Sequence, residues 1–172
     1  MNEEMNLEIR RLGKEDILDL KTLMLDVMSR LPSQDHFAMD EEDYFHDYVL
    51  DNGEIYGAYL GGSLAAYSVL TFPKRSEHNL GREFGVPESE LSHVAFLEAT
   101  VVHESARGRG LQRHFHRLRE RRAREYGCRY LFSTVHPDNH ASIRNLEHEG
   151  FSLAITRLMY GGKPRHSYVK RL

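Results

Sequence analysis

The chain has 172 residues, of which 40% are hydrophobic and 28% charged, and its formal net charge is −3 at pH 7. This length suits a single domain over 1–172 with a full core, and the composition is that of a soluble globular protein. The net charge argues against nucleic acid as a partner. The single cysteine, Cys128, excludes an internal disulfide, and the amino terminus lacks a secretion signal, so we expect a cytoplasmic protein. The most apolar run, 64–70, is too short to span a bilayer, so no membrane contact is expected.

The first half of the chain predicts strands, helices and a hairpin. Alternating apolar and polar residues indicate strands, and Gly61-Gly62 between two such runs is typical of a hairpin turn. The polar stretch 73–91 is expected to be a loop that folds over a ligand. The expected elements are a strand over 7–12, helices over 14–28 and 40–50, and strands over 54–60 and 63–72.

The second half begins with a strand–loop–helix–strand unit, which implies parallel pairing and a right-handed crossover. Its helix is expected to pack on a sheet through one face, formed by Leu111, Phe115, Leu118 and Tyr126. The expected elements are a strand over 93–102, a helix over 110–126, a strand over 130–135, a short helix ending at Gly150, and strands over 151–158 and 167–172 around Gly161-Gly162.

The segment between the strand over 93–102 and the following helix is a predicted anion site. It reads Arg107-Gly108-Arg109-Gly110-Leu111-Gln112. A helix start leaves backbone N–H groups unpaired at the positive end of the helix dipole. Glycines let a ligand approach the backbone closely, and arginines add positive charge. The loop therefore predicts a seat for a phosphate or a pyrophosphate.

Two familiar phosphate loops do not match this segment. A Walker loop needs a lysine after its second conserved glycine, and the loop has no lysine. The dinucleotide fingerprint needs a third glycine, where this chain has Arg113, and an acidic residue after the next strand, which ends in Val135-His136-Pro137.

A third possibility rests on a family resemblance. The Arg107–Gln112 segment resembles the Arg/Gln-x-x-Gly-x-Gly/Ala signature of the GNAT N-acetyltransferase superfamily. Asn139-His-Ala-Ser142 followed by Gly150-Phe151 is similar to a second motif of that family, at the family's spacing and within a matching order of elements. The resemblance implies an α/β (α+β) fold with a mixed sheet of about seven strands and about four helices. It also implies a splayed parallel strand pair that forms an acetyl-CoA cleft.

The same resemblance implies which residues hold acetyl-CoA. The pyrophosphate would lie on backbone N–H groups of the glycine loop, and the pantetheine arm along the preceding strand. Gln112 stands where the signature has a small residue, so its side chain must point away from the ligand. Asn139 and Ser142 also suit a helix cap, and both roles are compatible. The implied binding residues are Thr100, Val101, Val102, Arg107, Gly108, Arg109, Gly110, Leu111, Gln112, Asn139 and Ser142.

Glu98 is the candidate catalytic base. It lies in an otherwise apolar strand, where a carboxylate is costly unless it faces a cleft. Partial burial would raise its pKa toward the range of a general base, and in many members of the family an acid on this strand has that role. The alternative interpretation is that strand alternation turns Glu98 to solvent or toward an arginine.

The general acid has no clear candidate. Members of the family often use a tyrosine four residues before the Gly-Phe pair, and this chain has Leu146 there. Tyr160, His136 and His140 are substitutes to consider, although each is also an ordinary surface or packing residue.

The predicted function is therefore acetyl-CoA-dependent N-acetyltransfer to a primary amine of a small molecule or a peptide. A catalytically reduced acyl-CoA-binding module is the alternative, and a homodimer is one expectation for assembly. Histidine spacing completes no tetrahedral set, so we expect no metal. A nucleic-acid-binding domain would need a basic stripe with aromatics, but the arginines of the long helix surround several faces, which indicates a solvated surface. These are Arg113, Arg117, Arg119, Arg121, Arg122 and Arg124.

Overall fold

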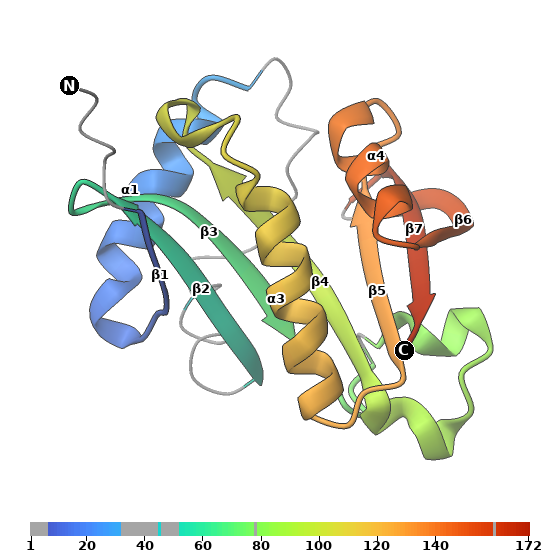
Figure 1. The fold of residues 1–172 in the computed structure, drawn as a ribbon. Helices are drawn as coiled ribbons and strands as arrows, with labels where there is room; N and C mark the ends of the chain where they lie inside the picture. Colours follow the sequence, from blue (N-terminus) through green and yellow to red (C-terminus); the bar gives the residue numbers. More distant parts are fainter. Residues whose placement is uncertain (1–6, 32–44, 46–51, 78, 160) are drawn as a thin grey trace.

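The computed structural model describes residues 7–31, 45, 52–77, 79–159 and 161–172. Seven strands form one sheet in the order β1-β2-β3-β4-β5-β7-β6 (Figure 1). The β4–β5 pair is parallel and the other neighbouring pairs are antiparallel. The strands are β1 (Leu7–Arg11), β2 (Gly53–Leu60), β3 (Ser63–Thr71), β4 (Val94–Val102), β5 (Tyr130–Val135), β6 (Ser152–Met159) and β7 (Lys163–Arg171).

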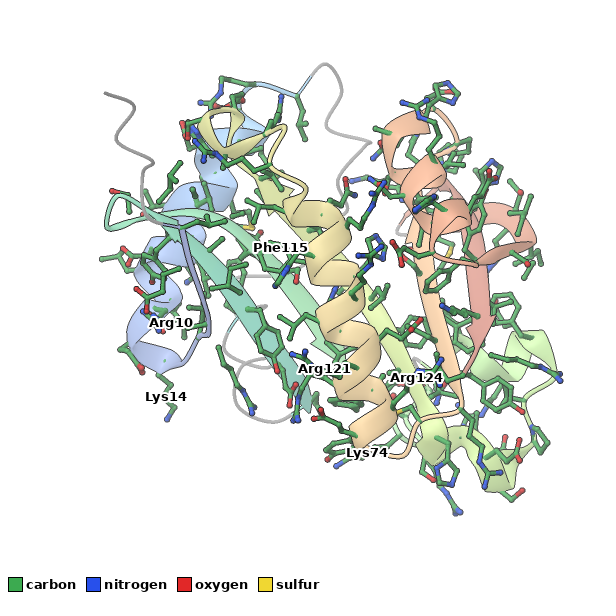
Figure 2. The ribbon with its side chains drawn as sticks, viewed as in Figure 1. Arg10, Lys14, Lys74, Phe115, Arg121 and Arg124 are labelled. Carbon is green, nitrogen blue, oxygen red and sulfur yellow. The ribbon has the colours of Figure 1, made fainter. Side chains whose placement is uncertain are left out.

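Helices cover both faces of the sheet (Figure 1). Alternation along β3 divides its side chains between the two faces. Tyr67 and Val69 pack with α1, whereas Ala66 packs with Phe115 of α3, a fully buried residue labelled in Figure 2. The α-helices are α1 (Ile17–Met28), α3 (Leu111–Glu125) and α4 (His140–His148), and the short 3-10 helices are η1 (Lys14–Asp16), η4 (Leu80–Phe84), η5 (Glu88–His93) and η6 (Glu104–Ala106).

Most expected elements that fall within the described residues are present, with two differences. The last strand begins at Lys163 instead of 167, because its register continues past Pro164 to pair Lys163 with Met159. The loop over 73–91 contains η4 and η5. Of the helix expected over 40–50, only Phe45 lies within the described residues; it is helical, and its ring packs edge-on against Tyr67 with 5.5 Å between centroids.

Two expectations for α3 are wrong. Tyr126 was expected on the packed face, but it is 57% exposed, because the helix ends at Glu125 and the ring stacks flat on Phe72 at its edge. Arg119 was expected on a solvated face, but it is 1% exposed. It follows Leu111 and Phe115 at a spacing of four residues, which places all three on the stripe that faces the sheet.

A buried carboxylate on β2 ties the sheet to the last turns of α3. Glu54 accepts hydrogen bonds from the Tyr56 hydroxyl (2.7 Å) and from Nε of Arg122 (3.1 Å), and it lies 3.4 Å from Arg11. Burial opposes ionisation of Glu54, but the hydrogen bonds from Arg122 and Tyr56 outweigh it and hold its pKa below the ordinary value.

Glu54→Gln is expected to lower the free energy of unfolding at pH 7 by about 1–2 kcal/mol, because the amide cannot supply the negative charge that pairs with Arg122 and Arg11. The folded pKa lies below the unfolded one. The stabilisation is therefore complete above a pH of about 4.3 and is lost as the pH falls through the folded value. Urea unfolding at several pH values should show the variant and the wild type converging in acid. Glu8→Gln, on the exposed face of β1, is the control; an undiminished difference in acid would contradict the assignment.

Candidate active site

The parallel pair β4–β5 separates halfway along its length. Register pairs run from Val94 with Tyr130 to Leu97 with Ser133 and then stop, although β4 continues to Val102. Beyond that point one edge of β4 is not covered by β5, so its backbone N–H and C=O groups are open to an extended ligand. A cavity of about 1070 Å³ occupies this opening.

The cavity gathers most of the predicted site residues. Glu98 lies in its wall, half-buried, together with the C-terminal half of β4. Gly108, Arg109 and Gly110 are exposed on the loop that precedes α3 and do not line the cavity, and Leu111 is buried under Phe115 and Ala106. The predicted binding residues that line it are Thr100, Val101, Val102, Arg107, Gln112, Asn139 and Ser142.

The glycine loop has the backbone shape of an anion seat. Gly108 and Gly110 have φ values of 77° and 72°, in the left-handed region, and Gly110 is the N-cap of α3. No side chain of the described residues caps this helix, whereas Asn139 Oδ1 accepts the Ser142 N–H at the start of α4. A Cβ built on either glycine would meet no protein atom within 4 Å. The start of α3 is therefore not capped by a side chain, and the glycines before it border open space, an arrangement that suits a pyrophosphate.

Gly110→Ala is expected to weaken acetyl-CoA binding by about 10- to 30-fold, because a methyl group would occupy the space above the N–H groups. Gly127→Ala is the matched control. Gly127 lies beyond the other end of α3 with a φ of 86°, and its Cβ would also meet nothing within 4 Å. Both variants should lose a similar amount of stability, about 1 kcal/mol. Calorimetric titration with acetyl-CoA distinguishes them, and equal affinities would contradict the assignment of the seat.

Gln112 is turned toward the neighbouring helix. Its Oε1 accepts a hydrogen bond from Nδ2 of Asn145 on α4, at 2.8 Å. This bond joins α3 to α4 across the cavity and leaves the backbone N–H of Gln112 within the first turn of the helix.

A bulge in β4 places Glu98. Leu70 pairs with Leu97 and Ser68 with Thr100, so Val69 is opposed by two residues, Glu98 and Ala99. Bulges bend a strand and redirect side chains, and they are common next to active sites. The carboxylate of Glu98 accepts a hydrogen bond from the Thr71 hydroxyl at 3.2 Å. The side chain of Glu98 thus borders the cavity, and its assignment as the base stays a prediction.

Arg119 holds the bulge from the side of α3. Its Nη1 donates to the carbonyl oxygens of Val69 (2.9 Å) and Glu98 (3.2 Å), and its Nη2 donates to Oγ1 of Thr100 (3.0 Å). The guanidinium thereby supplies hydrogen-bond donors to the backbone carbonyl oxygens at the bulge. Because the same helix begins at the anion seat, Arg119 links the seat to the strand that carries Glu98.

The residues considered for the general acid lie in different surroundings. Leu146 is 1% exposed and lies in the core with Leu131 and Tyr168. His136 lines the cavity, but its Nδ1 accepts the Asp138 N–H. His140 is exposed at the start of α4. Tyr160 lies outside the described residues.

Several residues of this cavity were not singled out from the sequence. They include Thr71, Arg119 and His116, which is 5% exposed and lines the wall formed by α3. The four-residue spacing from Leu111 and Phe115 was the available signal for Arg119, and the same spacing from Gln112 was the signal for His116. Thr71 carried no signal, because its role depends on the pairing of β3 with the bulge.

Within the described ranges, no three or more His, Cys, Asp and Glu side chains form a group suited to a metal ion. None of the described helices has the length and apolar character needed to cross a bilayer.

Comparison with known proteins identifies the family. The profile of the Acetyltransferase (GNAT) family matches residues 20–151. That match covers well over half of the sequence, so the chain belongs to the GNAT acetyltransferase family, whose acetyl donor is acetyl-CoA. Among curated proteins, none is similar enough in sequence to count as a match.

Solved structures share the fold over nearly the whole chain. An N-acetyltransferase from Staphylococcus aureus Mu50 has a TM-score of 0.73 at 19% identity, covering 96% of this chain and 98% of that one. The protein yncA from Salmonella typhimurium, solved with its cofactor acetyl-CoA, has a TM-score of 0.72 at 15% identity, covering 96% and 94%. The ribosomal-protein-S18-alanine N-acetyltransferase from Escherichia coli has a TM-score of 0.68 at 16% identity, with the same coverage. At these identities the likeness is one of fold.

Proposed function

We propose that this acetyltransferase transfers the acetyl group to a primary amine of a small molecule or a protein, by direct attack of the amine on the thioester of acetyl-CoA. The observation that carries the proposal is that Glu98 borders the same cavity as the uncovered edge of β4 and the first turn of α3. A base, a strand edge and an anion seat are thus within reach of one extended ligand.

Each part has a chemical task. The first turn of α3 holds the pyrophosphate, and the edge of β4 from Thr100 to Val102 pairs with the pantetheine arm. Acetyl-CoA supplies an acetyl group already activated as a thioester, so the chief tasks of the protein are to position the two substrates and to deprotonate the amine. Glu98 accepts the proton of the attacking amine, directly or through one water.

A second candidate function is acyl-CoA binding without transfer. It is favoured by Leu146, which is buried in the core and has no proton to donate. Fold alone does not distinguish these two functions, because a site must be judged by its own chemistry.

Two measurements in sequence test the proposal. Acetyl-CoA at 100 times its Kd should stabilise the protein by about 2.7 kcal/mol, which raises Tm by roughly 5–10 °C. A panel of primary amines should then release free thiol from acetyl-CoA in step with acetylated product. If acetyl-CoA stabilises the protein but no small amine or peptide in the panel causes thiol release, the result would support the binding module and contradict the transferase.

A further inference from the structure

His116 is a buried histidine in the cavity wall. It is 5% exposed, and its ring packs near Phe151 with 6.3 Å between centroids. Its Nδ1 is sealed from solvent and has no hydrogen-bond partner among the residues that the structure describes. Buried polar atoms are nearly always bonded, so an unpartnered imidazole beside a cavity needs an explanation.

The electrostatic environment keeps this imidazole neutral. Burial, followed by the positive charges of Arg119 and Lys170, lowers the pKa of His116 to about 3. A neutral imidazole carries one N–H. Because Nδ1 is buried without an acceptor among the described residues, the tautomer that can find a partner has its proton on Nε2.

The position of His116 along α3 lies between the anion seat and the base. Gln112 lies in the first turn of the helix, and His116 is one helical turn beyond it. His116 is three residues before Arg119, whose Nη1 bonds the carbonyl oxygen of Glu98 at 3.2 Å. His116 therefore lies along α3 between the helix start and the residue that bonds the Glu98 carbonyl, and it lines the cavity in which the donor arm would lie.

We propose that His116 is a catalytic residue that donates its Nε2–H to the sulfur of the thioester. This inference rests on the proposed function and supplies the group that Leu146 does not provide. As the amine nitrogen bonds to the carbonyl carbon, the carbon–sulfur bond breaks and its electron pair stays on sulfur. Glu98 takes the amine proton, and the neutral His116 stabilises the thiolate by hydrogen bonding. Glu98 then releases the amine proton to solvent and the thiolate takes a proton from solvent, so Glu98 and His116 are both unchanged over the cycle.

This role suits a neutral imidazole. An imidazole N–H is too weak an acid to protonate a thiolate, but it is a good hydrogen-bond donor to developing negative charge. The nearby cations Arg119 and Lys170 add a favourable field for that charge.

The acidity of bound coenzyme A tests the proposal without catalysis. The ultraviolet absorbance of the thiolate, titrated with pH in the complex with free CoA, gives the acid dissociation constant of the bound thiol. His116→Leu should lower that constant about tenfold, and His116→Gln, which keeps an N–H donor, should recover part of it. With acetyl-CoA and an amine, His116→Leu should lower kcat by about 10- to 100-fold with little change in KM. His114→Leu, on the exposed side of α3, is the matched control.

Two results would overturn the inference. The first is an equal thiol acidity in the wild type and His116→Leu; if CoA affinity falls in that variant at the same time, His116 lies against another part of the ligand. The second is the same loss of thiol acidity in His116→Gln as in His116→Leu. The titration needs no acceptor amine, so it tests His116 independently of acetyl transfer. Absence of thiol release with every amine would instead contradict the proposed function.

Discussion

Glu98→Gln is expected to lower kcat/KM for acetyl transfer by about 10²- to 10⁴-fold, the usual contribution of a general base. The amide has the shape of the carboxylate, and its oxygen can still accept the hydrogen bond that Thr71 donates at 3.2 Å. It cannot take a proton from the amine. The Kd for acetyl-CoA should therefore remain unchanged, and the loss should appear in kcat.

The pH profile makes this prediction specific. If ionised Glu98 is the base, kcat/KM in the wild type falls on the acidic side, and that limb is absent from the residual activity of Glu98→Gln. Glu88→Gln is the control, since Glu88 is 73% exposed in its side chain and pairs with Arg82 on the surface. An acidic limb that persists in Glu98→Gln would assign the base to another group.

Local patterns in the sequence were sufficient for most of the fold and for the backbone conformation of the glycine loop. Two glycines before an apolar-periodic helix specify left-handed backbone and a free helix start, and Gly108 and Gly110 have that conformation. The strand over 93–102 was likewise readable from its apolar run, and β4 spans Val94–Val102. These features depend on neighbours in the chain, which is why they are visible without a structure.

The geometry around Glu98 could not be read in the same way. The bulge arises from the register between β3 and β4, in which Val69 faces two residues. A register is a property of two strands that are distant in sequence, so no local pattern reports it. Alternation alone left Glu98 with two interpretations for the same reason.

The four-residue spacing along α3 also predicts that Arg119 is buried. Leu111, Phe115, Arg119 and Ala123 recur every four residues, and all four are buried. The six arginines as a group surround several faces of the helix, but Arg119 alone lies on the apolar stripe. Leu146 is instructive in the opposite sense, because its burial in the core accounts for an apolar residue at that position. The polar group that we propose in its place, His116, is on α3, and its spacing from Gln112 points to the site only once the cavity is known.

Arg119→Met is expected to lower the free energy of unfolding by about 3–4 kcal/mol, a large effect for one substitution. Methionine fills a similar volume but donates no hydrogen bond. The carbonyl oxygens of Val69 and Glu98 would lose donors at 2.9 and 3.2 Å while remaining buried at the bulge. Leaving buried acceptors unsatisfied costs more than the bonds themselves contribute. For a chain of this size the corresponding drop in Tm is roughly 6–15 °C.

Arg121→Met on the same helix is the matched control. Arg121, labelled in Figure 2, is 67% exposed in its side chain and lies 3.9 Å from Glu125, so its loss should change stability by no more than about 0.5 kcal/mol. Arg119→Lys should fall between the two, because a single ammonium group cannot reach all the oxygens that the planar guanidinium reaches. Denaturant unfolding with an unchanged m-value is the measurement. If Arg119→Met were as stable as Arg121→Met, the bulge would have to hold its shape without the guanidinium, and the link from the anion seat to Glu98 would lie elsewhere on α3.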